Sequence, residues 1–153
     1  MTLKVHSPSF ASGETIPQKH TCDGANVSPM ITWSEPPAGT QSIALIADDP
    51  DAPGGTWVHW AIFNIPAESS GLTEGVQPLP ELPNATRQGV TDFRKVGYGG
   101  PCPPPGKPHR YFFKVYALDT MLDLKAGAMK LDLERAMQGH ILARGELMGR
   151  YAR

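Results

Sequence analysis

The chain has 153 residues, the length of one ordinary domain, so we expect a single domain over residues 1–153 with its own hydrophobic core. Its 14 basic and 15 acidic side chains give a net charge of -1, which provides no basic stripe for binding a nucleic acid. We expect a soluble, cytoplasmic protein, because the first residues form no apolar signal segment and no stretch approaches the roughly 18 apolar residues of a membrane span.

Strand-like segments dominate the chain, and helical signals appear only near its end. The predicted strands are 2–5, 30–33, 42–48, 58–65 and 111–117. Segments 42–48 and 58–65 are nearly continuous in apolar residues, which is typical of central strands covered on both faces. Asp132 can cap a short turn of helix that Gly139 ends, and 140–149 is interpreted as a second short helix. The sequence predicts a mainly β domain with short C-terminal helices.

The segment 66–108 is longer than an ordinary connection between two strands. Loops of more than about 15 residues in a compact domain are usually functional or contain short elements of their own. Residues 90–93 are a candidate for one more strand. We expect much of the wall of any binding pocket to come from this segment.

Two short motifs carry most of the chemical information: DDPDAPGGTWVHW at 48–60 and GGPCPPPGKPHRY at 99–111. Each begins with glycine and proline residues that exclude a continuing helix, and each ends on a histidine that enters a strand. If the two strands are neighbours, the loops gather Asp49, His59, His109 and Tyr111 around one small polar hollow. Such a hollow suits an anion or a phosphorylated head group.

Alternation along each strand predicts how these side chains point. One face of the earlier strand carries His59, Ala61, Phe63 and Ile65. In the later strand His109 and Tyr111 share a face, so both can contact one ligand. Histidines with pKa values near the ordinary 6.5 donate hydrogen bonds to an anion and become cationic when it arrives. Asp49 is expected to orient an imidazole or to accept a proton from the ligand.

Each feature also has a structural interpretation without a ligand. The Asp48 to Asp51 run is also typical of a simple turn, and Trp57 packs in a core as readily as in a pocket wall. Gly99 and Gly100 let backbone N–H groups approach an oxyanion as a nest does.

The two cysteines, Cys22 and Cys102, are too few for a four-cysteine metal site or a disulfide framework. We expect free thiols in a reducing cytosol. Both cysteines nevertheless lie in loop sequence rich in glycine, proline or asparagine, so a disulfide between the two loops is the alternative.

The motifs together resemble the phosphatidylethanolamine-binding proteins, also called Raf kinase inhibitor-like proteins, and are most similar to their compact bacterial and archaeal branch. The segments that carry the resemblance are TCDGANVSP at 21–29, DDPDAP at 48–53, WVHW at 57–60, GYGGPCPPPGKPHRY at 97–111 and GHILARGELMGRY at 139–151. The resemblance covers nearly the whole chain. It implies a fold in which a large antiparallel sheet packs against a smaller one, with helices at the C-terminus.

The resemblance also implies a small anion site for phosphate, acetate, cacodylate or phosphoethanolamine-type groups. Carried over to matching positions, the implied ligand-binding residues are Asp49, His59, Gly100, Pro101, His109 and Tyr111, with Asp51 and Trp57 as supporting or wall positions. A cis bond between Ala52 and Pro53 is a further implication. Gly145 departs from the helix-forming residue expected in the final helix, and the chain lacks the longer terminal extensions of eukaryotic members.

Two classes of function follow. The favoured prediction is a binding or regulatory module without a cofactor or a metal, in which occupancy by a phosphorylated group alters an inhibitory contact with a kinase or a protease; a homodimer is plausible. No motif residue has an evident nucleophilic role, since prolines follow Cys102 and no flanking base accompanies it. The alternative is an enzyme that uses the aspartate and histidines for acid–base chemistry, or that holds a metal through Asp49, His59 and His109.

Overall fold

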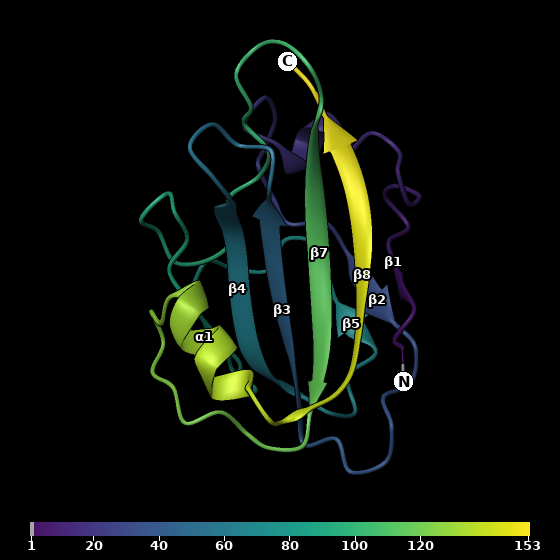
Figure 1. Ribbon diagram of the computed structural model, residues 1–153, viewed down its shortest axis with the longest axis vertical. Helices are drawn as coiled ribbons and strands as arrows, with labels where there is room; N and C mark the ends of the chain where they lie inside the picture. Colours follow the sequence, from purple (N-terminus) through teal and green to yellow (C-terminus); the bar gives the residue numbers. More distant parts are fainter. Residues whose placement is uncertain (1) are drawn as a thin grey trace.

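The protein is built around a five-stranded antiparallel sheet with the strand order β6-β4-β3-β7-β8 (Figure 1). A computed structural model describes residues 2–153. In sheet order the strands are β6 (Arg87–Gln88), β4 (Trp57–Pro66), β3 (Ser42–Asp49), β7 (His109–Leu118) and β8 (Ile141–Tyr151). β3 is buried along its whole length, as its continuous apolar run predicts. The mainly β architecture expected from the sequence is confirmed.

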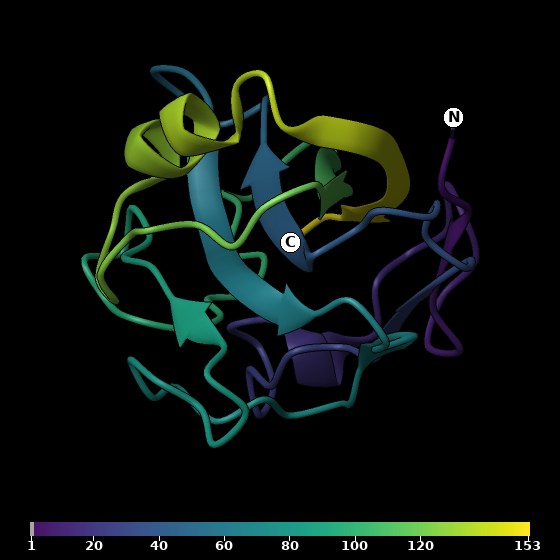
Figure 2. The same cartoon turned by 90° about the horizontal axis from the view of Figure 1, so that it is seen from below.

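A smaller antiparallel sheet covers one face of the large sheet. Its strands are β1 (Val5–His6), β2 (Ile31–Trp33) and β5 (Gly71–Leu72), in the order β1-β2-β5. Side chains of β1 and β2 pack with residues of β3 and β7 in one buried apolar cluster, which is the main core. A short 3-10 helix, η1 (Gln18–His20), lies on this side of the large sheet (Figure 2).

On the opposite face of the large sheet, the α-helix α1 (Lys130–Met137) lies over β4 and β3 (Figure 2). Its Leu133 and Met137 pack onto Phe63 and Ile46 of the sheet in a second apolar cluster. The helix begins earlier than predicted, because Asp132 occupies the third helical position and accepts a hydrogen bond from Met129 N at 3.0 Å. This contact still caps the first turn.

The predicted helix at 140–149 is wrong, because these residues belong to β8. The strand pairs with β7 in unbroken antiparallel register from His109 opposite Tyr151 to Ala117 opposite Ala143. Ala143 and Leu147 enter the main core with the period of two that a strand requires. Gly145 is therefore no weak point of a helix. A Cβ at this position would collide with the backbone carbonyl of Leu3.

The N-terminal residues run along the outer edge of β8. Thr2 forms a parallel bridge with Arg144, and Thr15 forms one with Arg150. Leu3 N donates to Arg144 O at 2.8 Å, and Ile16 N donates to Arg150 O at 2.8 Å. The strand expected at 2–5 is accordingly reduced to β1, since its first residues pair with the large sheet instead.

The long segment between β4 and β7 contains β5 and β6, and it forms no strand at 90–93. Only Val90 makes an isolated bridge there, with Val96. Backbone groups of this segment instead bond to the edge of β4: Gly89 N donates to Ala61 O at 2.8 Å, and Asp92 N donates to Val58 O at 3.0 Å. The segment thus closes the free edge of the sheet.

Cys22 and Cys102 form a disulfide, so the expectation of free thiols is wrong. The S–S distance is 2.07 Å and the Cα atoms lie 5.4 Å apart. Cys22 N also donates to Pro101 O at 3.1 Å, so the two loops are in direct contact. Composition alone cannot reveal that contact.

The bond between Ala52 and Pro53 is trans, because residues 2–153 contain no cis peptide, so the expected cis bond is wrong. Within the same residues, no helix combines the length and the apolar character needed to cross a membrane.

Candidate functional site

Three adjacent strands deliver the polar residues of the site to one end of the large sheet. Asp49 ends β3, His59 lies near the start of β4, and His109 and Tyr111 lie at the start of β7. The sequence analysis supposed that the two motif strands, β4 and β7, are neighbours, and this is wrong because β3 lies between them. Asp49 is consequently flanked by both motifs.

The side chains enclose a cavity of about 260 Å³. The residues lining it are Asp49, Ala52, Pro53, Trp57, His59, Phe93, Cys102, Pro103, Pro104, His109 and Tyr111. Five residues singled out from the sequence are thus brought together, and the imidazoles of the two motifs face one space. No lysine or arginine lines the cavity.

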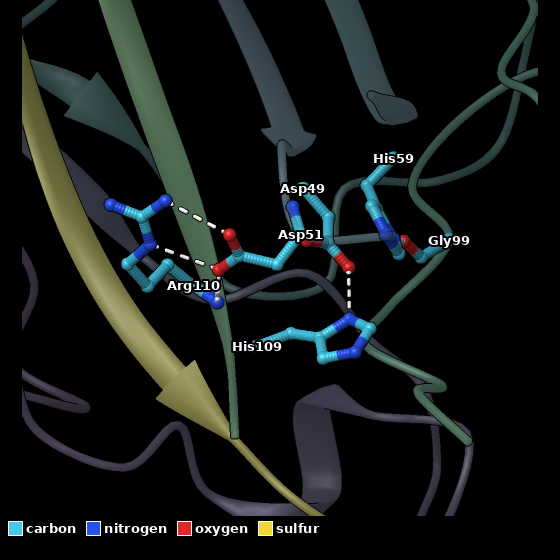
Figure 3. Close-up of polar contacts among 6 residues, drawn as sticks. All are labelled: Asp49, Asp51, His59, Gly99, His109 and Arg110. Atoms are coloured by element: carbon cyan, nitrogen blue, oxygen red, sulfur yellow. Dashed lines mark hydrogen bonds and ion pairs between the residues drawn. The ribbon is translucent and has the colours of Figure 1, made fainter. Parts of the chain in front are cut away.

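Asp49 is buried, and its carboxylate accepts hydrogen bonds from two donors. His109 Nδ1 lies 2.7 Å from Asp49 Oδ2, the contact drawn in Figure 3. Asp51 N donates to Asp49 Oδ1 at 2.7 Å, which closes a turn at the end of β3. Because a carboxylate only accepts, His109 carries its proton on Nδ1, and its Nε2 is left for other contacts.

Asp51 supports the site without lining the cavity. Its carboxylate receives two hydrogen bonds from the Arg110 guanidinium, each at 2.9 Å, and a third from Arg110 N at 2.9 Å (Figure 3). These bonds lower the pKa of Asp51 to about 2. They tie the loop after β3 to the residue beside His109, so they help to hold that imidazole in place.

A β-bulge aims His59 at the cavity. Ala47 pairs with Trp60, but the next residue of β3, Asp48, pairs with Val58, so His59 is the extra residue. Plain alternation would place His59 on the α1 side of the sheet. Its ring instead meets the ring of Tyr111 at 5.2 Å between centroids, on the face of the main core.

A second irregularity lies further along β4. The register shifts between Ile43 and Leu45 of β3, and Asn64 has a positive φ of 57°. Ile65 therefore packs in the main core, whereas Phe63 packs under α1. The expectation that these two residues share a face is wrong for this reason.

Burial favours the neutral form of the His59 imidazole. His59 Nδ1 lies 2.6 Å from Gly99 O, and a carbonyl only accepts, so Nδ1 carries the proton. Burial lowers the pKa of His59, and this effect outweighs the nearby Gly99 carbonyl and the charge of Asp49, which oppose it. The expectation of an ordinary pKa for this histidine is wrong. Its Nε2 presents a lone pair.

Tyr111 is the buried polar group of the site without a partner. Among residues 2–153 its hydroxyl is the one buried side-chain oxygen or nitrogen that makes no hydrogen bond. Burial, followed by the negative charge of Asp49, raises the pKa of Tyr111, so the phenol keeps its proton. The ring stacks on His109 with a centroid separation of 6.4 Å and an interplanar angle of 25°.

Gly100 and Pro101 do not line the cavity. Gly100 N donates to Asn26 Oδ1 at 2.8 Å, and Gly99 N donates to His59 O at 2.9 Å. Both N–H groups that a nest would offer to an anion are thus occupied. Gly100 is required for another reason: a Cβ there would collide with the carbonyl of His20.

The apolar wall comes from Trp57 and from the segment 66–108, as expected, but the sequence interpretation did not single out Phe93, Pro103 or Pro104. Phe93 packs edge-on against both Trp57 and His59, with centroid separations of 5.5 and 5.2 Å. Pro103 and Pro104 line the cavity beside the disulfide. The run of three prolines is the sequence signal for this rigid wall, whereas nothing in the local sequence of Phe93 indicates its position.

The site does not form a metal-binding cluster. Within the described chain, 2–153, no three His, Cys, Asp or Glu side chains converge as metal ligands. Asp49 and His109 are bonded to each other, and His59 points its bonded nitrogen at a backbone carbonyl. The arrangement is suited to hydrogen bonding of a polar ligand.

Comparison with known sequences assigns the chain to a family. Residues 6–152 match the sequence pattern described as "Phosphatidylethanolamine-binding protein". The chain belongs to the phosphatidylethanolamine-binding protein family. This confirms the resemblance noted from the motifs.

Relatives of the family match along nearly the whole chain. A UPF0098 protein of Methanothermobacter thermautotrophicus is 51% identical over 153 residues, which cover 100% of this chain and 99% of that protein. A UPF0098 protein of Aquifex aeolicus is 49% identical, with coverage of 99% and 89%.

Solved structures of phosphatidylethanolamine-binding protein homologues share the fold. YbcL of Escherichia coli matches with a TM-score of 0.92 and 36% identity, covering 100% of this chain and 99% of that one. The Chlamydia trachomatis homologue CT736 matches with a TM-score of 0.90 and 38% identity, covering 99% and 98%. The two-sheet architecture is therefore that of the family.

Proposed function

We propose that the protein binds a small oxyanion, such as phosphate or a phosphorylated head group, in the cavity between β3, β4 and β7. Asp49, His59, His109 and Tyr111 are the proposed contact residues, and Trp57 is a wall residue. Gly100 and Pro101 then act by shaping the loop behind the wall. Family membership supports the proposal in general terms.

The buried hydroxyl of Tyr111 is the observation that carries this proposal. An unsatisfied buried polar group costs about 1–3 kcal/mol of stability, so it is seldom retained without a use. A ligand oxygen in the cavity accepts from this hydroxyl. His109 is fixed by Asp49 with its free nitrogen available to the same ligand.

The apolar wall sets the kind of molecule that carries the oxyanion. Trp57, Phe93, Pro103 and Pro104 line the cavity beside the polar residues. Rigid rings and prolines lose little conformational entropy when a ligand binds. A phosphate ester with a short organic group fits this division better than a bare ion does.

Replacement of Tyr111 by Phe tests the proposal, because it removes only the hydroxyl. Calorimetry with O-phosphorylethanolamine should show affinity at least tenfold lower, since a hydrogen bond to a charged group contributes about 1.5–3 kcal/mol. Stability in urea should be unchanged or higher, because the buried hydroxyl lacks a protein partner. Tyr116→Phe, on the α1 side of the sheet, is the matched control. Equal affinities of the wild-type and Tyr111→Phe proteins contradict the proposal.

A regulatory role forms the second half of the proposal. An occupied site would alter an inhibitory contact with a kinase or a protease, and a homodimer is one form in which the protein would act. Inhibition assays with and without O-phosphorylethanolamine, together with sedimentation at several concentrations, test these points. If inhibition is the same with and without O-phosphorylethanolamine, the inhibitor role does not depend on the binding site.

The disulfide bears on the proposed cytoplasmic location. Disulfides persist in oxidising compartments and in intracellular proteins of hyperthermophiles, so the pairing of Cys22 with Cys102 removes the support that free thiols offered. Fractionation of the source cells with immediate thiol blocking tests the location and the pairing together.

The hydrogen bond between Asp49 and His109 favours one alternative, an acid–base enzyme. A carboxylate that orients an imidazole is part of many hydrolytic sites. Slow release of p-nitrophenol from p-nitrophenyl phosphate, abolished in His109→Ala, would establish this alternative. Stoichiometric binding without turnover would establish the binding module.

A further inference from the structure

This inference rests on the proposed function and names its ligand class. We infer that the site selects an oxyanion that still carries one proton, and that the lone pair of His59 Nε2 imposes this choice by accepting the O–H of the ligand. His59 is then a specificity-determining residue, distinct from the anion-stabilising role of His109.

The ring proton of His59 is on Nδ1. Gly99 O lies 2.6 Å from Nδ1 and fixes the proton there, since a carbonyl oxygen has none to give. Nε2 makes no hydrogen bond to any residue in the described part of the chain, and the imidazole lines the cavity. In the neutral ring this nitrogen accepts and does not donate.

Ionisable groups from β3, from β7 and from the loop beside β4 surround His59. Asp49 and Asp48 come from β3, and their negative charge favours a protonated ring; burial outweighs both and lowers the pKa of His59. His109 and Tyr111 face it from β7. In the loop packed against β4, Asp92 directs its carboxylate to Val58 N at 2.6 Å.

The described cavity lining offers little positive charge to a ligand. The cavity lining contains the Asp49 carboxylate and no lysine or arginine. Arg110 and Asp51, beside the cavity, form an ion pair and neutralise each other's charge. A fully ionised dianion would therefore meet one carboxylate, one imidazole lone pair and at most one cationic imidazole.

A singly protonated oxyanion satisfies every group that faces the cavity. Its ionised oxygens accept from the Tyr111 hydroxyl and from Nε2 of His109 in its imidazolium form, whose other N–H is held by Asp49, and its O–H donates to His59 Nε2. If the oxyanion carries no proton, a lone pair of its oxygen faces the lone pair of His59 Nε2. A ligand that leaves a buried polar group of the site unpaired is rejected strongly. The loss of affinity is larger than the loss from a missing apolar contact.

Methyl phosphate and methyl sulfate provide a matched pair of probes. At about pH 5.5 methyl phosphate is mainly a monoanion with one P–OH, because its second pKa is about 6. Methyl sulfate has nearly the same shape and the same charge but no O–H. By calorimetry at constant ionic strength, the wild-type protein should bind methyl phosphate at least tenfold more tightly than methyl sulfate. Between pH 5.5 and 8 this preference should shrink, because methyl phosphate loses its proton.

His59→Asn is the decisive variant, since its amide N–H can still donate to Gly99 O while the Nε2 position is lost. This substitution should lower the affinity for methyl phosphate at least tenfold and leave the affinity for methyl sulfate unchanged, so the preference for methyl phosphate disappears. His109→Gln should lower the affinity for both probes and keep the preference for methyl phosphate. His140→Asn, at an exposed histidine bonded to Asp119 away from the cavity, is the control that changes neither.

The outcomes separate the two proposals. Equal binding of the two probes by the wild-type protein overturns the selection of a protonated ligand and leaves oxyanion binding in place. A preference that survives in folded His59→Asn shows that His59 does not impose it and likewise overturns the inference. Binding of neither probe overturns the proposed function itself. Should His59→Asn fail to fold, the comparison of the two probes on the wild-type protein decides alone.

Discussion

His109 and Asp49 are 60 positions apart in the chain, yet His109 Nδ1 lies 2.7 Å from the Asp49 carboxylate. The contact joins two strands that neighbour each other in the sheet, so the relationship depends on the whole fold and not on a local motif. Because Nδ1 contacts Asp49, the other imidazole nitrogen, Nε2, is left for a ligand in the cavity.

Replacing His109 by Ala should remove one donor to the ligand and weaken O-phosphorylethanolamine binding at least tenfold, because a charge-assisted hydrogen bond contributes about 1.5–3 kcal/mol. Calorimetry measures the affinity, and thermal unfolding without ligand verifies the fold. Unchanged affinity in a folded variant would remove His109 from the site.

Acid should destabilise the protein through Asp51. The folded protein holds the pKa of this carboxyl at about 2, below its ordinary 3.8, chiefly through the hydrogen bonds from Arg110. The unfolded chain therefore binds more protons between about pH 4 and pH 2, and stability falls as the pH falls through this window. Part of the effect is screened, since both side chains are partly exposed.

The substitution Asp51→Asn checks this prediction. In urea titrations at pH 5 and pH 2.5, the loss of stability on acidification should be smaller in the variant than in the wild-type protein. Asp123→Asn, at an exposed position, is the control and should follow the wild type. Identical pH dependence of all three proteins would show that the Asp51–Arg110 pair does not contribute.

Breaking the disulfide should lower stability. The bridge joins cysteines 80 positions apart, and crosslinks over such loops typically contribute about 2–4 kcal/mol, mainly by restricting the unfolded chain. The double variant Cys22→Ser, Cys102→Ser should unfold at a lower urea concentration and should not respond to reductant. The wild-type protein should shift toward it when a dithiol is added. Two titratable thiols in the unreduced wild-type protein would contradict the bridge.

Gly145→Ala should destabilise the fold by about 1–3 kcal/mol, because the added methyl group must displace the backbone of Leu3. Glu146→Ala, at the neighbouring exposed position of β8, should change stability by no more than about 0.5 kcal/mol. Urea unfolding compares the two. Similar stabilities would mean that the N-terminal segment moves aside without cost.

The sequence predicted the long central strands because their apolar runs are continuous, as in β3. It failed at 140–149, where Ile141, Leu142, Gly145 and Met148 fit a helical face nearly as well as Ala143 and Leu147 fit a strand. The pairing with β7 decides this, and pairing is a property of two distant segments. Short apolar runs are ambiguous for this reason.

The candidate site was predictable in its polar residues, and less so in its chemistry. Motif spacing pointed to Asp49, His59, His109 and Tyr111, which do line one cavity. The lowered pKa of His59 and the position of its ring proton were not predictable, because they depend on burial and on a carbonyl 40 positions away in the chain. The bulge that turns this ring toward Tyr111 is likewise set by register with β3.

The N-terminal segment that runs beside β8 has a consequence for behaviour at high concentration. An uncovered edge of an 11-residue strand is a template for another chain to add to by main-chain pairing. The bridges from Thr2 and Thr15 occupy that template from within the same molecule. Removing the first 16 residues would expose this edge and would also delete the core residues Val5 and Ile16, so the truncated chain should be more prone to aggregation.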